Sequence, residues 1–275
     1  MAGIVTREEP EVSWSEFDRA FYECKSVSGR ASEPIPDAIN TLSCFADNAA
    51  ARENPDLVPV SDTGEAATAE RPYFDWSHVC PTHEEYREGL LEMIESAGDT
   101  SGDVRLDDVG FPRAEYCHCD RCDAAFTASE YDDRAEWRAG VITDFLAAAR
   151  ERVPGDLYLA LYPDPYPGHL HERSGIDLAA VERLADEVVV PLYDTSYGTT
   201  YWLEALAGGF VDAVDLPVTV ELYAVDVDID ALLGAVEVAE SVADHVCYGY
   251  DASTARAAIR RRGADSREGV DHRPE

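Results

Sequence analysis

The sequence is almost devoid of lysine. Lys25 is the only one, and lysine and arginine together number 22 against 56 aspartates and glutamates, which gives a formal net charge of −34. No basic stripe is available to contact phosphates, so nucleic acid is excluded as an expected partner. Because the acids are spread along the whole chain, they indicate a surface adapted to a salt-rich (halophilic) cytosol, where screening weakens their mutual repulsion.

Long apolar runs are also missing. No stretch approaches the roughly 20 apolar residues that cross a bilayer, and the opening MAGIVTREEPEVS has no apolar signal core. The sequence therefore predicts a cytoplasmic protein with no membrane partner. Its 275 residues, 45% of them hydrophobic, suit one large domain, and their periodicity argues against disorder.

No glycine-rich fingerprint follows any candidate strand, which argues against nucleotide binding. What the chain does contain is alternation of strands and helices. Candidate strands cover 41–46, 104–110, 157–162, 188–193, 218–223 and 245–250, and helical patterns such as 178–188, 201–213 and 229–243 lie between them. Strict alternation predicts a parallel sheet, and this many units favour a (β/α)8 TIM barrel over a doubly wound sheet.

The N-terminal part follows this pattern less clearly. Trp14, Phe17 and Phe21 fall on one face of a helix. We therefore expect an N-terminal helical segment over 1–39, a barrel domain over 40–262 and a flexible tail over 263–275. Since only about six strands can be counted against the eight of a full barrel, the barrel is expected to be incomplete or rearranged at its N-terminus, or completed by a partner chain in a homo-oligomer.

Three of the seven cysteines are packed into a C-x-C-x-x-C run at 117–122, in a chain whose other features argue against disulfides. Thiolates at this spacing can converge on one tetrahedral ion, for which zinc is the default. Four thiolates leave no open position for a substrate, so the zinc is expected to be structural. The expected ligands are Cys117, Cys119, Cys122 and, as the fourth, Cys80, with His118 and His83 in reserve.

Acids that follow strands are the second chemical signal, because the chemistry of a parallel barrel lies at the C-terminal ends of its strands. The catalytic candidates are Asp107, Asp108 and Glu221. Glu221 interrupts an apolar strand, where it needs either a function or an arginine partner. The substrate-binding candidates combine polar groups with aromatic faces, as sugars require: Asp47, Asn48, Asp164, Tyr193, Asp194, Tyr223 and Tyr250.

Several of these segments resemble glycoside hydrolase family 42 β-galactosidases and related barrel hydrolases. The matching stretches are Asn54-Pro55-Asp56-Leu57-Val58, Asp62-Thr63-Gly64, Cys80-Pro81 through Tyr86-Arg87, and Leu106-Asp107-Asp108 followed by Cys117. The resemblance is best over 40–125. It implies a carbohydrate substrate, Cys80 as the fourth zinc ligand, and a nucleophile near Glu221. The family's acid is usually a glutamate preceded by asparagine, where this chain has Asp107-Asp108.

The sequence thus predicts hydrolysis of O-glycosidic bonds in an oligo- or polysaccharide. Glu221 would be the nucleophile, and Asp108 or Asp107 would protonate the leaving oxygen, with about 5–5.5 Å between the carboxyls for retention or about 6.5–9.5 Å for inversion. Two alternatives stay open: a non-catalytic carbohydrate-binding barrel that has lost its acid pair, and another class of hydrolase with a catalytic metal at the cysteines.

Overall fold

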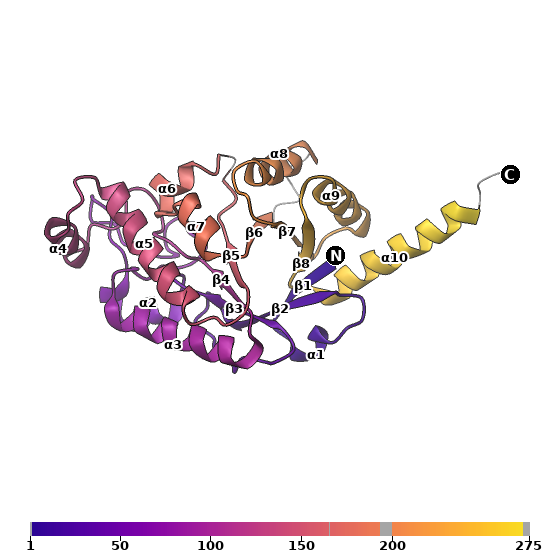
Figure 1. The fold of residues 1–275 in the computed structure, drawn as a ribbon, viewed down its shortest axis with the longest axis horizontal. Coiled ribbons are helices and arrows are strands. Elements are labelled where there is room, and N and C mark those ends of the chain that lie inside the picture. Colours follow the sequence, from indigo (N-terminus) through magenta and orange to yellow (C-terminus); the bar gives the residue numbers. More distant parts are fainter. Residues whose placement is uncertain (1, 165, 193–199, 272–275) are drawn as a thin grey trace.

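The chain closes into a barrel of eight parallel strands, in the computed structural model that describes residues 2–164, 166–192 and 200–271 (Figure 1). The strands follow one another around the barrel in chain order, and β8 closes onto β1 through the pair Ile4 and Tyr248. The predicted TIM barrel is therefore confirmed. The strands are β1 (Ala2–Thr6), β2 (Arg19–Lys25), β3 (Ile39–Ser43), β4 (Val104–Asp107), β5 (Leu157–Ala160), β6 (Glu187–Leu192), β7 (Val218–Tyr223) and β8 (His245–Gly249).

Helices cover the outside of the barrel and bury their apolar faces against the strands. In this acidic chain aspartate is the recurrent N-cap: Asp133, Asp177 and Asp228 each accept hydrogen bonds from the first turn of the helix that follows. The helices are α1 (Glu9–Val12), α2 (Asn48–Glu53), α3 (Glu84–Ser101), α4 (Asp120–Ala128), α5 (Arg134–Arg150), α6 (His169–Ser174), α7 (Leu178–Leu184), α8 (Thr200–Val211), α9 (Ile229–Val242) and α10 (Ala252–Asp271), with a 3-10 turn η1 (Pro55–Leu57) after α2.

The expected N-terminal helical segment is wrong, because β1 and β2 both lie within residues 1–39. Strand β2 is buried along almost its whole length, since the barrel interior covers one face and the outer layer covers the other. Such a strand shows no polar–apolar alternation. Of the three aromatic residues that suggested a helical face, Trp14 and Phe17 precede β2 and only Phe21 lies in it. One chain therefore supplies all eight strands, so neither an incomplete barrel nor a partner chain is needed.

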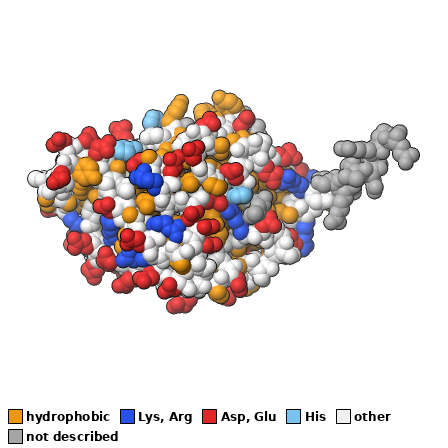
Figure 2. All heavy atoms as spheres, viewed as in Figure 1, with side chains coloured by type: hydrophobic (Ala, Val, Ile, Leu, Met, Phe, Trp, Pro, Cys, Tyr) orange, Lys and Arg blue, Asp and Glu red, His pale blue; other side chains and the backbone are white. Residues whose placement is uncertain are grey.

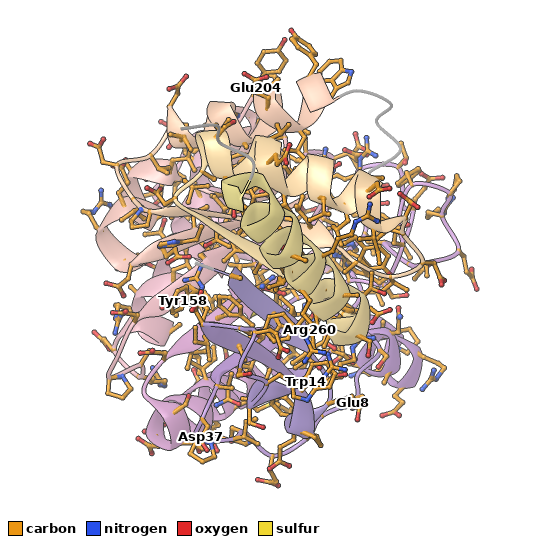
Figure 3. The ribbon with its side chains drawn as sticks, turned by 90° about the vertical axis from the view of Figure 1, so that its right-hand side faces the viewer. Glu8, Trp14, Asp37, Tyr158, Glu204 and Arg260 are labelled. Carbon is orange, nitrogen blue, oxygen red and sulfur yellow. The ribbon has the colours of Figure 1, made fainter. Side chains whose placement is uncertain are left out.

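The expected tail begins within a helix. Helix α10 continues through residue 263 to Asp271, and residues 272–275 lie outside the described part. Its first half is attached to the start of the chain: the guanidinium of Arg256 lies 3.9 Å from the ring centroid of Trp14, and Arg260 forms an ion pair with Glu16. Figure 3 shows Arg260 and Trp14 close together where α10 crosses the strands.

Acidic side chains are spread over the visible face of the molecule rather than gathered in one patch (Figure 2). None of the helices in the described ranges is both long and apolar enough to cross a bilayer.

Layers of side chains fill the barrel interior. At the N-terminal end of the strands Arg19 forms an ion pair with Glu187 at 2.7 Å. A small apolar cluster that includes Phe21 comes next, and the Phe21 ring lies between two guanidiniums, those of Arg19 and Arg105, each 5.2 Å from its centroid. The barrel interior is thus a packed core. Arg105 and the two acids that it contacts, Asp107 and Glu221, form a charged layer toward the C-terminal ends of the strands.

Candidate functional site

Arg105 on β4 brings two of the predicted catalytic acids together. Its Nε lies 2.6 Å from Asp107 Oδ1, and its Nη2 lies 3.0 Å from Asp107 Oδ2 and 2.6 Å from Glu221 Oε2. Asp107 Oδ2 and Glu221 Oε2 therefore contact the same nitrogen, Nη2 of Arg105. The distance between these two oxygens cannot exceed the sum of the two contact distances. Glu221 and Arg105 are fully buried, whereas Asp107 keeps 15% of its side chain exposed at the barrel mouth.

The charges in this group explain why Asp107 holds a proton readily. Burial raises its pKa to about 7, and the nearby Glu221 and Asp108 carboxylates act in the same direction, against the attraction of Arg105. One guanidinium cannot neutralise two carboxylates in a medium of low dielectric. Burial and the neighbouring acids therefore favour the protonated form of Asp107, while Asp107 and Glu221 both contact Arg105.

Asp108 points to different partners, because its backbone has a φ of 55° and turns the chain directly after β4. Its Oδ2 lies 2.7 Å from Ser43 Oγ, which also lies 2.8 Å from the carbonyl oxygen of Ala46. The Ser43 hydroxyl is the donor to both oxygens. Burial raises the pKa of Asp108 to about 6, against the hydrogen bond from Ser43, which lowers it.

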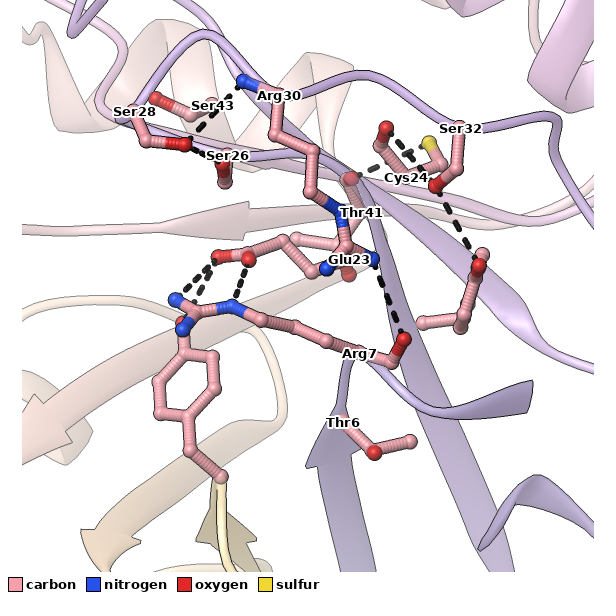
Figure 4. Close-up of polar contacts among 12 residues, drawn as sticks. Thr6, Arg7, Glu23, Cys24, Ser26, Ser28, Arg30, Ser32, Thr41 and Ser43 are labelled. Atoms are coloured by element: carbon pink, nitrogen blue, oxygen red, sulfur yellow. Dashed lines mark hydrogen bonds and ion pairs between the residues drawn. The ribbon is translucent and has the colours of Figure 1, made fainter. Parts of the chain in front are cut away.

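A second ion pair joins the ends of the first two strands (Figure 4). Arg7, directly after β1, binds Glu23 on β2, and the hydroxyl of Tyr250 donates to Glu23 Oε1 at 3.3 Å. The guanidinium of Arg7 also lies 4.6 Å from the ring centroid of Tyr250, which in turn is 6.4 Å from that of Tyr223. The two predicted tyrosines therefore lie side by side at the barrel mouth.

The predicted substrate ligands Asp47 and Asn48 make contacts within the protein. Asp47 caps α2 and its Oδ2 binds both Lys25 Nζ, at 3.1 Å, and the Tyr86 hydroxyl, at 3.1 Å. Asn48 accepts the backbone N–H of Ser77 at 2.8 Å. These contacts hold the start of α2 in place, and the binding of a sugar by the two residues stays a prediction.

Of the remaining predicted ligands, Asp164 lies on the connection after β5 and accepts the N–H of Tyr166 at 2.8 Å. Tyr193 and Asp194 lie outside the described residues.

The cations of the site were not identified from the sequence, although an arginine was one of the two explanations for Glu221. Arg105 and Arg7 contact acids on other strands, and Lys25 contacts Asp47 at the start of α2. A signal existed for Arg105, since a residue two positions before Asp107 on the same strand faces the same side. Lys25 is almost fully buried, and a buried charge needs a partner.

Arg138 on α5 holds two loops together beneath the mouth. Its guanidinium donates to four backbone carbonyl oxygens, those of Arg113 and Ala114 after β4 and those of Glu172 and Arg173 on α6, at 2.8–3.1 Å. Arg138 is 2% exposed, and burial lowers its pKa to about 10. We call this group the Arg138 clamp. It fixes the β4–α4 connection against α6.

We expect Arg138→Met to lower the free energy of unfolding by about 3 kcal/mol or more, because four buried carbonyls lose their donor. The melting temperature should fall by roughly 6–12 °C. Differential scanning calorimetry of the full chain checks this. Arg183→Met is the matched control, since Arg183 is exposed and binds one carbonyl of its own helix. Equal losses in the two variants would show that the clamp adds nothing.

The four predicted metal ligands come together in the structure. The Sγ atoms of Cys80, Cys117, Cys119 and Cys122 all lie within 4.8 Å of one another. Tetrahedral zinc with Zn–S bonds of about 2.3 Å needs sulfur atoms roughly 3.8 Å apart, so this spacing fits the ion. The N–H groups of Val60 and Cys119 lie 3.4 Å from Cys117 Sγ, as donors that support a thiolate.

Neither reserve histidine belongs to this group. The Nδ1 of His83 accepts the N–H of Tyr86 and caps α3, and His118 lies 3.7 Å from Asp123. The cysteine cluster joins the β3–α3 connection, which carries Cys80, to the β4–α4 connection, which carries Cys117 and Cys119, and to the first turn of α4, which carries Cys122. These are the connections that follow the strands of Ser43 and Asp107.

The fold of this barrel is shared by solved structures of glycoside hydrolases. The PgaB (BpsB) glycoside hydrolase domain from Bordetella bronchiseptica is 16% identical, with a TM-score of 0.59 over 78% of this chain and 70% of that one. Alpha-L-fucosidase isoenzyme 2 from Paenibacillus thiaminolyticus is 12% identical, with a TM-score of 0.65 over 98% of this chain. This chain spans about half of the fucosidase, 49%. At such identities the similarity concerns the fold.

No protein-family model and no curated protein matches the sequence.

Proposed function

We propose that the protein hydrolyses O-glycosidic bonds in an oligo- or polysaccharide, as a relative of the family 42-like barrel hydrolases. The observation that carries the proposal is the contact of Asp107 and Glu221 with one nitrogen of Arg105. The upper limit that these two contacts set on the distance between the carboxyl oxygens is compatible with the roughly 5–5.5 Å separation of retaining glycosidases. The glycoside-cleaving neighbours in fold and the cysteine cluster beside the fourth strand support the same class.

The two acids would divide the chemistry between them. Asp107, the exposed member of the pair and the one with the raised pKa, gives its proton to the leaving oxygen. Glu221 attacks the anomeric carbon as the carboxylate and forms a glycosyl–enzyme ester. Asp107, now ionised, takes a proton from water, which hydrolyses the ester and restores Glu221. Arg105 balances the charge that moves between the two acids.

The pH dependence of the reaction tests this assignment. A general acid works only while it carries its proton, so kcat/KM should fall about tenfold for each pH unit above the Asp107 pKa of about 7. We would measure it on a panel of aryl glycosides in concentrated KCl, because the charge of −34 requires screening. A rate that stays constant between pH 7 and 9 would remove Asp107 from this role.

One observation favours a second function, that of a non-catalytic carbohydrate-binding barrel. Glu221 is fully buried against Arg105, which is also what a purely structural ion pair would look like. A protein of that kind would bind sugars at the mouth and turn over none of the panel.

We further propose that the cysteine cluster holds one structural zinc and that the protein works in a salt-rich cytoplasm. The donor set of four thiols supports the first part. The chain-wide excess of acids supports the second. When bound, the zinc would fix the connections that follow β3 and β4, with no position left for substrate.

A further inference from the structure

A pocket opens at the C-terminal end of the barrel, between the connection that follows β4 and the one that follows β5. Its volume is about 260 Å³, near the lower end of small-ligand pockets, which begin at about 300 Å³. Six ionisable side chains line it: Arg113, Glu115, Asp164, His169, Glu172 and Arg173. Two pairs among them are in contact, Arg113 with Glu115 at 3.0 Å and His169 with Asp164 at 3.6 Å. Strands β4 and β5 are neighbours that pair through Leu106 and Leu159, so the two connections that form the pocket begin on the side of the barrel where Asp107 ends β4.

The pocket is formed before any ligand arrives, because the Arg138 clamp builds its walls. All four carbonyls that Arg138 binds belong to residues that line the pocket. The N–H of Phe111 adds a further link by donating to the carbonyl of Ser174 at 2.9 Å. Burying a guanidinium without a carboxylate partner costs free energy of folding. The hydrogen bonds of Arg138 keep the concave surface of the pocket ordered, so a ligand does not have to order it on binding.

The lining offers donors and acceptors in equal measure. Three carboxylates can accept hydrogen bonds, and two guanidiniums and an imidazole can donate them. The guanidinium of Arg173 lies 3.8 Å from the ring centroid of Tyr162, which is 53% exposed, and it forms no ion pair within the described ranges. An aromatic face beside mixed donors and acceptors suits a pyranose ring, which has apolar C–H faces and hydroxyls around its edge.

We propose that this pocket binds one neutral sugar unit, next to the unit whose bond is cleaved over Asp107. The adjacency to a cleavage site rests on the proposed function. The pocket would then select for a chain of sugars, because a terminal sugar with a small aglycone leaves it empty. A uronic acid is disfavoured, since its carboxylate would meet Glu115, Asp164 and Glu172.

Binding without turnover provides the test. The full-length Asp107→Asn variant would be titrated calorimetrically in concentrated KCl with four probes: neutral tetrasaccharides of β-linked galactose, glucose and N-acetylglucosamine, and tetragalacturonate. We expect at least one neutral probe to bind. Adding Arg173→Ala or Tyr162→Ala should raise its Kd about tenfold or more. The Arg138 clamp uses the Arg173 carbonyl and not its side chain, so this change leaves the walls in place.

Arg256→Ala is the matched control, because Arg256 also stacks on an aromatic ring, that of Trp14, but on α10. It should leave the Kd unchanged. Binding of tetragalacturonate alone, no binding of any neutral probe, or a Kd unmoved by both pocket variants would overturn the proposal. Neutral binding that the pocket variants weaken, in a protein that hydrolyses no glycoside, would instead refute the hydrolase and leave the sugar site standing.

Discussion

Glu221→Gln should lower kcat by roughly 10⁴-fold or more on any glycoside that the protein cleaves, because the nucleophile of a two-step reaction is lost. The amide keeps the shape of the side chain, and its oxygen can still accept from Arg105. Steady-state kinetics and circular dichroism on the same samples measure activity and folding together. A glutamate that served only the structure would lose stability and little of its turnover per folded molecule.

Two further variants make the comparison specific. Glu221→Ala opens space in which added azide can attack the anomeric carbon, so azide should restore part of the rate. Asp108→Asn is the matched change in a neighbouring acid that binds Ser43 rather than Arg105, and its loss of kcat should be much smaller. If Asp108→Asn were as inactive as Asp107→Asn, the proton donor would have to be reassigned.

Loss of the proposed zinc should have the largest effect on stability. Structural zinc in small cysteine sites contributes apparent binding free energies of about 10 kcal/mol or more, comparable to the stability of a whole domain. Part of that free energy orders the connections after β3 and β4, so Cys122→Ser should lower the melting temperature by at least about 10 °C. Calorimetry, with metal analysis of the same samples, checks both quantities.

The control for this change is Cys24→Ser. Cys24 is also buried, but it lies outside the cluster and donates to the carbonyl of Thr41, a bond that serine can also form. This variant should keep one zinc per chain and nearly the full melting temperature. A wild-type protein without bound metal, or a Cys122→Ser variant as stable as the control, would contradict a structural metal centre.

The later strands could be predicted because each is marked by a local apolar run. The cysteine centre could be predicted because its metal chemistry requires a fourth ligand. Strand β7 has the bounds 218–223 that its apolar run indicates, with Glu221 as its one charged residue. Cys80 is 37 residues from Cys117 in the sequence, yet a three-thiol run demands a fourth ligand, and the Cys-Pro segment offered one.

The rest depends on contacts between segments that the sequence does not show together. Nothing local distinguishes β1 or β2 from a short helix, because strands buried on both faces lack alternation. The start of α3 also depends on contacts with another segment. His83 is its cap, and the Thr82 hydroxyl lies 3.1 Å from Cys80 Sγ and 3.2 Å from Cys122 Sγ.

The acids of the site were predicted as a pair, but the arginine that both of them contact was not. That Asp107 and Glu221 share Arg105 follows from the barrel register, which places β4 and β7 across the interior from each other.

The most direct measurement of the central claim is to trap the glycosyl–enzyme ester. The protein would be incubated in concentrated KCl with the 2-deoxy-2-fluoro analogue of whichever aryl glycoside it cleaves, digested, and mapped by mass spectrometry. The Asp107–Glu221 pair predicts one sugar per chain, attached to the peptide that contains Glu221. A label on another carboxylate, or an intact, folded protein that cleaves no glycoside and takes up no label, would contradict it.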